Sequence, residues 1–509
     1  MNIESAKEQI KSTVKAYIEK DKYNQPVIPI EKQRPIFLIG PPGVGKTAIV
    51  NQVAAELRIG FNAYSMTHHT RQSALGLPFI VHKGYKGEEY PVTEYTMSEI
   101  VSDTYEYIEA GYENGILFLD ELNCVSETLS PVMLQLLQQK KFGKHSIPQG
   151  WVIVAAGNPP QYNNSVHEMD IVTWDRIKRI DVEEDWKTWK EYAIQTGVHP
   201  AIISYLETKP EYFYSLETTP EGKRFVTARG WDDLSSIIRS YERLKNPVDK
   251  DLIVQYVQNS KIASDFSNYY DLYKRYKDDY KIEAILDGQY TDQEYKSVIS
   301  RASRASFDIV VSIVSIFSDI IIRDCKEIIL KNGALAEIRK TFDDVSIESK
   351  KSRAETLNCL NDIVNDKNKA ITAGSKSGSV TRTELEKMRM AVYMIEEIIK
   401  KVANSQTDTD VYSVVRAAHN ENVNALRVLA DKTLSKTINA IKFVEEAYKA
   451  GSNYMTMFIT SLTVSYYSAT FLARHHCQPY VDHSQGVNVH ARSKLINAQL
   501  STISQLEIK

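Results

Sequence analysis

The stretch Gly40-Pro41-Pro42-Gly43-Val44-Gly45-Lys46-Thr47 decides the fold of the first part of the chain. It follows the apolar run PIFLI at residues 35–39, which has the length and composition of a buried strand. The run AIVNQVA at residues 48–54 comes next and has a helical pattern. A glycine-rich connection in this position is either a plain tight turn or a loop whose backbone amides face an anion.

The spacing of the stretch favours the anion-binding interpretation, because it fits the pattern G-x-x-x-x-G-K-S/T in full. In such a loop Lys46 reaches the β- and γ-phosphates of a nucleotide, and the Thr47 hydroxyl binds Mg²⁺. The positive end of the following helix adds to the attraction. The residues expected to hold the nucleotide are Gly40, Pro41, Pro42, Gly43, Val44, Gly45, Lys46, Thr47 and Ala48.

A second motif, GILFLDE at residues 115–121, predicts a buried strand that ends in two carboxylates. Ligands of open α/β sheets bind at the carboxyl ends of the strands. Asp120 is therefore expected to bind Mg²⁺, directly or through water, and Glu121 to polarise the water that attacks the γ-phosphate. Taken alone, the motif is equally compatible with a strand followed by a charged turn.

A third strand pattern, WVIVAAGNPP at residues 151–160, ends at Asn158. A side-chain amide at that place is able to orient the attacking water against the γ-phosphate. The chain has a phosphate loop, then a strand ending in acidic residues, then a strand ending in Asn158. This order makes Asn158 a candidate site residue instead of an ordinary loop residue.

In the order and spacing of these motifs, residues 30–285 resemble the AAA+ ATPases, and specifically the MoxR-like branch. The stretches WDR at 174–176 and TARGW at 227–231 complete the resemblance. It implies that Asn158 is the sensor-one residue, Arg176 the arginine finger and Arg229 the sensor-two arginine at the start of a lid helix. Asp175-Arg176 is followed here by Ile177 instead of the usual phenylalanine, which leaves Arg179 as a second candidate finger. Surface ion pairs of both arginines with the acidic stretch 181–185 are the alternative.

The resemblance and the pattern of apolar residues predict an α/β fold with an all-α C-terminal region. We expect a P-loop AAA+ parallel-sheet domain over residues 1–185, a helical lid over 186–288, and a helical region over 289–509 split by a flexible linker near 373–380. The helical region matches no motif that assigns it a function.

Composition limits the remaining choices. Of the 509 residues, 43% are hydrophobic and 25% charged, which argues against wholesale disorder. A net charge of -3 without a basic run makes nucleic acid an unlikely main partner. Four scattered cysteines and a charged N-terminal segment predict a cytoplasmic protein. The uncharged stretch 452–473 is interpreted as a buried helix and not as a membrane span.

Two loop segments, one aromatic stripe and one group of histidine and cysteine residues each fit two interpretations. Residues 64–80 and 141–147 lie where the family has an inserted loop and a hairpin that contact clients, although plain loops fit as well. Aromatic residues at helical spacing predict either a base-stacking surface or a core stripe: Phe266, Tyr269, Tyr273, Tyr276 and Tyr280. Residues of metal-binding types lie close together in the sequence near the C-terminus, at an irregular spacing that is compatible with either a zinc site or a polar loop: His475, His476, Cys477, His483 and His490.

The leading hypothesis is an ATP- and Mg²⁺-dependent ring motor, expected to be a homo-hexamer, that remodels or matures a protein client. The MoxR resemblance implies a partner with a von Willebrand factor A domain. Two alternatives are a nucleic-acid-stimulated ATPase motor and a nucleotide-switched assembly scaffold with slow turnover.

Overall fold

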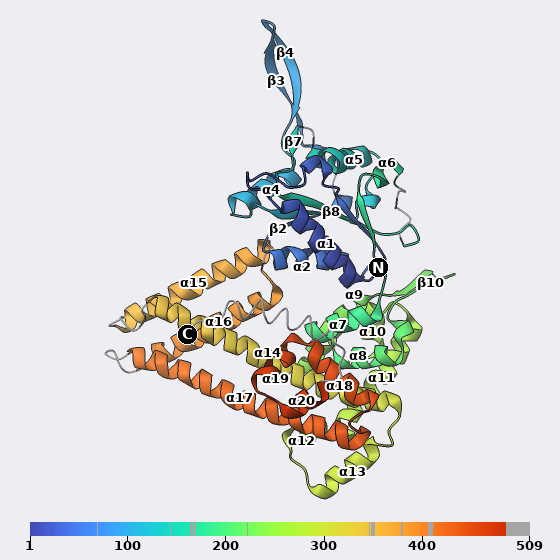
Figure 1. Cartoon of the computed structure of the whole chain (residues 1–509), viewed down its shortest axis with the longest axis vertical. Helices are drawn as coiled ribbons and strands as arrows, with labels where there is room; N and C mark the ends of the chain where they lie inside the picture. The colour runs from blue at the N-terminus through green and yellow to red at the C-terminus, as the bar shows by residue number, and fades with distance from the viewer. Residues whose placement is uncertain are drawn as a thin grey trace. The chain divides into compact units, whose positions relative to one another are not determined.

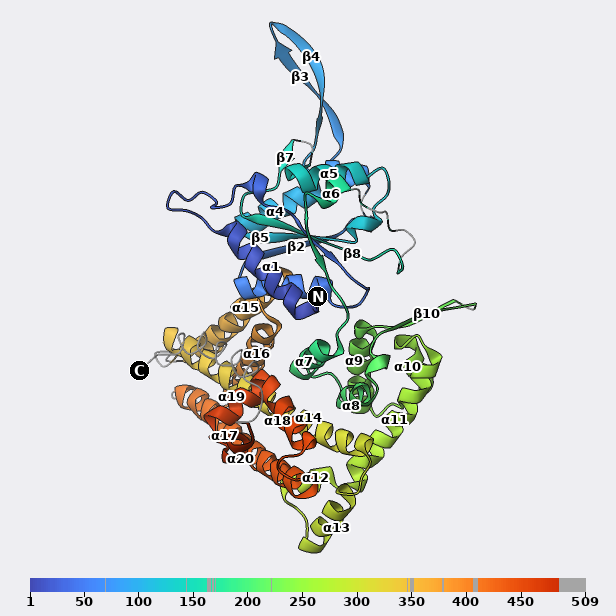
Figure 2. The same ribbon diagram turned by 45° about the vertical axis from the view of Figure 1, so that its right-hand side comes forward.

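The computed structural model describes residues 1–484 except 69, 143, 163–165, 167, 168, 170, 221, 346, 348–351, 378, 379 and 406–410. The chain divides into two compact units. The first contains residues 1–185 together with 369–385, and the second contains residues 186–368 together with those from 386 onward. Figures 1 and 2 label most of the helices and several strands of both units.

The described residues of the first unit form a parallel sheet of five strands in the order β2-β5-β8-β1-β9. β1 lies between β8 and β9, and Ile36 is in register with Val154 on one side and Lys178 on the other. The carboxyl ends of β1, β5 and β8 therefore meet at one edge of the sheet. The strands are β1 (Ile36–Ile39), β2 (Gly60–Ser65), β5 (Gly115–Asp120), β8 (Trp151–Gly157) and β9 (Lys178–Asp181).

Both faces of this sheet are buried, which explains why its central strands are continuous apolar runs. Leu117 and Leu119 of β5 pack on one face with helices α4 and α5, while Ile116 and Phe118 pack on the other with α1 and α2. This is the two-residue alternation of an extended strand. The helices of the unit are α1 (Ile3–Ile18), α2 (Lys46–Leu57), α3 (Arg71–Leu75), α4 (Glu99–Glu109), α5 (Ser130–Gln139) and α6 (Ile171–Trp174).

The inserted segment at 64–80 contains more structure than the expected loop. It holds the end of β2, helix α3 and the start of a long antiparallel hairpin, β3 (Pro78–Tyr85) with β4 (Glu88–Tyr95), drawn as a free-standing ribbon in Figure 1. The segment at 141–147 contains the expected short hairpin, β6 (Lys141–Phe142) with β7 (His145–Ser146). Lys144 pairs with Glu94 at 2.8 Å, so the two hairpins are tied together. Hydrogen bonds from Lys144 and Lys83 hold the pKa of Glu94 at about 2.

The second unit is largely helical. Its first helices are α7 (Trp186–Thr196), α8 (Pro200–Thr208), α9 (Ala228–Leu244), α10 (Lys250–Tyr256), α11 (Ser260–Asp279) and α12 (Ile282–Asp287), with a hairpin of β10 (Ser215–Thr219) and β11 (Gly222–Val226) before α9. They are followed by α13 (Asp292–Ala302), α14 (Phe307–Asp344), α15 (Arg353–Ser377), α16 (Arg382–Ala403), α17 (Val411–Tyr448), α18 (Asn453–Val464), α19 (Tyr466–Arg474) and α20 (Gln478–Ser484).

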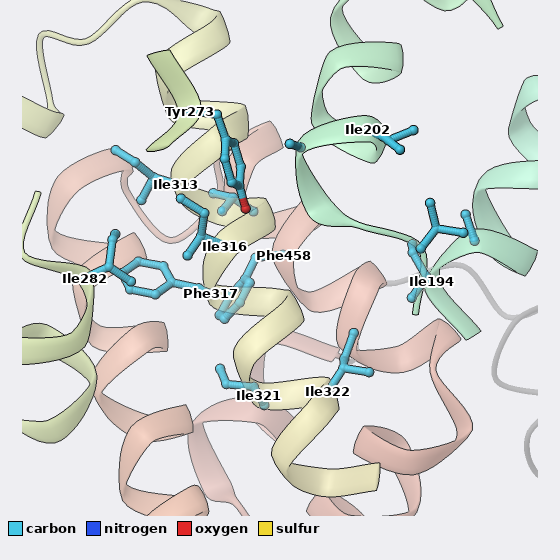
Figure 3. Packing of buried hydrophobic residues seen from close by; sticks show 14 of the residues in the cluster. Ile194, Ile202, Tyr273, Ile282, Ile313, Ile316, Phe317, Ile321, Ile322 and Phe458 are labelled. Carbon is cyan, nitrogen blue, oxygen red and sulfur yellow. The ribbon is translucent and has the colours of Figure 1, made fainter. Parts of the chain in front are cut away.

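Helix α14 is the centre of this unit. It packs against α8, α11, α17, α18 and α19, and its residues from Val310 to Ile328 are buried around most of the helix. A helix that is apolar on all sides needs neighbours on all sides. Figure 3 shows Ile313, Phe317 and Ile321 of α14 within this packing. Residues from both sides of the boundary expected at 288 belong to one hydrophobic core, so the unit does not separate there.

Two ambiguous stretches belong to the same core. In α11, Phe266 is fully buried and Tyr273 is 6% exposed, while Tyr269 and Tyr276 are partly buried against the same core. The aromatic stripe is therefore a core-facing stripe and not a surface for stacking bases. The uncharged stretch 452–473 forms α18 and α19, which are interrupted at Ser465. No helix formed by the described residues has both the length and the apolarity needed to cross a membrane.

The linker expected at 373–380 is wrong over most of its length. Helix α15 continues through Ser377, and residues 378 and 379 lie outside the described part of the chain. Gly374 serves close packing, because a Cβ atom there would meet Val380 Cγ2 at 2.6 Å. After Val380, Thr381 and Glu384 exchange hydrogen bonds in a capping box that starts α16.

We predict that Phe443→Ala, in α17, destabilises α8, since both belong to the continuous core. Phe443 is fully buried and packs against Phe317 of α14, and such truncations cost about 3–5 kcal/mol of unfolding free energy. Hydrogen exchange measured by mass spectrometry should show faster exchange of the α8 amides. The control is Val428→Ala on the same helix, where the side chain is 70% exposed. Unchanged exchange in α8 would contradict a shared core.

Candidate nucleotide site

The loop after β1 turns directly into helix α2, as the motif predicts. Gly45 is the N-cap of α2 and has a φ of 98°, a left-handed conformation that favours glycine. Lys46 begins the helix, and its side chain is 8% exposed. The Lys46 ammonium donates hydrogen bonds to the carbonyl oxygens of Gly40 at 2.7 Å and Pro41 at 2.9 Å. The loop and its lysine are thus folded into one compact structure.

Thr47 and Asp120 meet although 73 residues separate them in the sequence. The Thr47 hydroxyl donates to Asp120 Oδ2 at 2.8 Å. Oxygen ligands bind Mg²⁺ at about 2.0–2.1 Å in an octahedron, so adjacent ligands lie about 3 Å apart. The two oxygens therefore have the spacing of neighbouring Mg²⁺ ligands, and the donor set fits the expected ion.

Asn158 joins the same group from the end of β8. Its Oδ1 accepts a hydrogen bond from the Lys46 ammonium at 2.9 Å. The sequence analysis missed Asn123, whose Nδ2 donates to the Asn158 carbonyl at 2.7 Å. At Gly157, a Cβ atom would lie 2.3 Å from Asn123 Oδ1, so only glycine allows this approach. Asn123 and Gly157 together fix the backbone that carries Asn158.

Glu121 follows β5 in a left-handed conformation, with a φ of 56°. A positive φ is uncommon for a residue with a side chain, and such residues cluster at functional sites. The Glu121 Oε2 atom accepts hydrogen bonds from Thr67 Oγ1 at 2.9 Å and from Ser65 Oγ at 3.4 Å. Neither partner was predicted, because single hydroxyl residues at the end of β2 form no motif.

The two candidate fingers, Arg176 and Arg179, differ in their surroundings. Arg179 pairs with Asp181 at 2.8 Å and lies over the Trp174 ring at 4.7 Å, so the surface ion pair considered above exists for this residue. Arg176 is exposed in the turn before β9, and the described residues offer it no ion pair. Lys178 is in register with Ile36 at the start of β1. Arg176 therefore lies at the opposite edge of the sheet from the phosphate loop, across about 13 Å of strand.

Two further expectations concern the second unit. Arg229 is exposed in the first turn of α9, where Thr227 caps the helix by accepting from the Gly230 amide at 3.1 Å. The contact of Arg229 with a nucleotide stays a prediction.

The described residues contain no group of three or more metal-binding side chains that includes His475, His476, Cys477 or His483, and His490 lies outside the described residues. Cys477 is buried at 2% exposure.

One curated protein is similar to part of this chain. A curated relative, an ATP-dependent protease ATP-binding subunit-like protein from Rhodococcus erythropolis, is 34% identical over 110 residues, which is 20% of this chain and 28% of the relative. The chain thus matches less than a third of that protein's length.

Two solved structures are also similar. A RuvB variant from Thermotoga maritima has 14% identity and a TM-score of 0.29, with 51% of this chain and 69% of that chain covered. A putative ATPase from Cytophaga hutchinsonii has 15% identity and a TM-score of 0.22, with 50% and 85% covered.

The family comparison defines the part of the chain that carries the site. Residues 35–177 match the family AAA domain (dynein-related subfamily), and the match begins just before β1 and ends just before β9. It contains the phosphate loop, Asp120, Glu121 and Asn158. The candidate site therefore lies within the segment of this chain that is similar to an AAA domain.

Proposed function

We propose that this chain is an ATP-hydrolysing AAA+ motor that assembles head to tail into a ring, which we take to be a hexamer, and remodels or matures a protein client. The observation that carries the proposal is the convergence of Lys46, Thr47, Asp120 and Asn158 at one sheet edge, with Glu121 beside them. The MoxR type and a client partner with a von Willebrand factor A domain come from the sequence resemblance alone.

In this proposal the loop amides and Lys46 hold the β- and γ-phosphates, and Thr47 and Asp120 hold Mg²⁺. The bound ion would neutralise charge on the phosphates. Glu121 polarises the attacking water, and Asn158, which already contacts Lys46, orients that water. Arg176 stabilises the transition state in a neighbouring copy, because its position at the far edge of the sheet keeps it from its own loop.

The aromatic stripe of α11 packs against the core, so it does not support the hypothesis of a nucleic-acid motor. A slow nucleotide-switched scaffold remains the alternative, and a direct measurement separates it. Steady-state hydrolysis by the purified protein, with and without DNA, RNA or an unfolded protein, distinguishes the three functions. Stimulation by nucleic acid alone would overturn the protein-client proposal.

We predict that Lys46→Met weakens ATP binding by at least about 100-fold, because two charge-assisted contacts to phosphate of about 1.5–3 kcal/mol each are lost. Methionine keeps the apolar stem of the side chain, so the loop loses chiefly its charge. Equilibrium dialysis with ATP and Mg²⁺ measures the effect. The control, Lys22→Met, removes an exposed lysine from the same unit and should bind ATP like the parent. Parental affinity in Lys46→Met would contradict the phosphate-loop assignment.

We predict that Thr67→Ala raises basal ATP hydrolysis roughly fivefold. The Thr67 hydroxyl donates a hydrogen bond to Glu121 Oε2. Removing this hydrogen bond, which contributes about 1 kcal/mol, leaves the Glu121 carboxylate more available to accept a hydrogen bond from the attacking water. Single-turnover hydrolysis at saturating ATP measures the chemical step. Thr93→Ala, on the exposed hairpin strand β4, is the matched control. If turnover falls instead, Thr67 holds Glu121 in its working position and the prediction is wrong.

We predict that mixing Arg176→Ala with Glu121→Gln restores hydrolysis that neither variant shows alone. Arg176 and Glu121 would serve opposite sides of one composite site, so a mixed ring contains some interfaces with both residues intact. An arginine finger contributes about 10³- to 10⁵-fold in rate, which makes even a minority of repaired sites visible. Recovered activity should rise with total protein concentration.

The same mixing experiment with Arg179→Ala is the control. Because Arg179 is held by Asp181 and Trp174, its loss alone should leave most of the activity. A mixture of Arg176→Ala and Glu121→Gln that assembles and binds ATP but stays inactive would exclude Arg176 as a residue acting in the neighbouring copy.

A further inference from the structure

The second unit contains a pocket of about 230 Å³ that no part of the proposed ATPase mechanism uses. Its walls come from two groups of helices, α7, α8 and α9 on one side and α14, α18 and α19 on the other. Pockets for drug-sized ligands are typically about 300–1,000 Å³, so this one suits a small ligand.

Most of the lining is apolar. Ile194 of α7 and Ile322 of α14, both labelled in Figure 3, line the pocket together with Val198, Ile203 and the Tyr467 ring. A surface of this kind favours a hydrocarbon body, because removing apolar area from water is favourable. The lining hydroxyls of Ser318 and Ser461 donate to carbonyl oxygens of their own helices, at 2.9 Å and 3.0 Å.

Among the described residues, one cation of the lining is held in no hydrogen bond or ion pair. Arg239 donates to the Gly197 carbonyl at 3.0 Å and to Asp319 at 2.7 Å, so this pair is neutral and closes one side of the pocket. Lys326 pairs with Glu386 at 2.6 Å. Arg323, one turn after Asp319 on α14, is exposed and joined to no described residue by a hydrogen bond or ion pair.

We propose that this pocket binds a small amphiphile with a hydrocarbon body and a single carboxylate. The body lies against Ile194, Ile203 and Ile322, and the carboxylate pairs with the Arg323 guanidinium. Together with Lys277, Arg323 contributes to lowering the pKa of Glu283, but no described residue holds the Arg323 guanidinium in a hydrogen bond or ion pair. A single guanidinium matches a singly charged anion, whereas a phosphate monoester carries about -1.5 to -2 near neutral pH. The planar guanidinium also fits a carboxylate through two parallel hydrogen bonds.

The test uses octanoate as the probe and the full-length protein, with binding measured by isothermal titration calorimetry. Octan-1-ol has the same body without the charge, and acetate has the charge without the body. Octanoate should bind one site per chain, octan-1-ol at least about tenfold more weakly, and acetate without measurable heat. Equal affinity for octanoate and octan-1-ol, or no binding of octanoate, overturns the proposal.

Variants locate the binding in this pocket. Arg323→Gln should weaken octanoate about tenfold, as expected for loss of one charged hydrogen-bonding partner, and leave octan-1-ol unchanged. Ser461→Phe should fill the pocket and remove binding of both. The control, Arg275→Gln, removes an exposed arginine of α11 that does not line the pocket and should change nothing. Octanoate binding that survives Arg323→Gln at full strength overturns the assignment of the carboxylate.

Discussion

The parallel pairing of β1 with β8 is the constraint on which the candidate site depends. It brings the end of β1, where the phosphate loop starts, next to the end of β8, where Asn158 stands. The Lys46 ammonium then bridges the two, since it binds the loop carbonyls and Asn158 Oδ1 at once. Pairing of β5 with β8 adds Asp120 to the same edge, within 2.8 Å of Thr47. A slip of one residue in either pairing would turn these side chains to the wrong face.

In the second unit, the corresponding constraint is the continuous core around α14. Helix α9 carries Arg229 in its first turn, and Arg239, farther along the same helix, is bound to Asp319 of α14. Trp231 of α9 is fully buried in that core as well. Interiors packed at native density do not let one helix turn independently of its neighbours. A displacement at the Arg229 end of α9 must therefore be accommodated by α14 and the helices packed against it.

The sequence predicted the features that depend on local spacing. The loop 40–47, the strand ending at Asp120 and the strand ending at Asn158 are each short patterns whose order fixes their meeting place. Prediction from the sequence failed where two contacting residues lie far apart along the chain. It also failed where a glycine that is typical of a flexible linker instead allows close packing. Thr67 and Asn123 contact Glu121 and Asn158 across 54 and 35 residues. Gly374 looked like part of a linker, but it lies within helix α15 and packs closely against Val380. The hairpin β3–β4 was missed because its side chains are largely exposed and show no burial pattern.

The backbone conformation of Glu121 links the ends of β5 and β8. Its backbone is in a left-handed conformation that costs a non-glycine residue of the order of 1–3 kcal/mol, and it persists because the surroundings determine it. The Glu121 amide donates to Asp120 Oδ1 at 2.9 Å, and the following 3₁₀ turn, Leu122–Cys124, buries Leu122. This turn also carries Asn123 to the Asn158 carbonyl. The conformation that turns the Glu121 carboxylate toward Thr67 is thus the same one that anchors Asn158. A shift of Glu121 or Asn158 therefore also displaces the turn 121–124. This turn couples Glu121, the proposed base, to Asn158, which is expected to orient the attacking water.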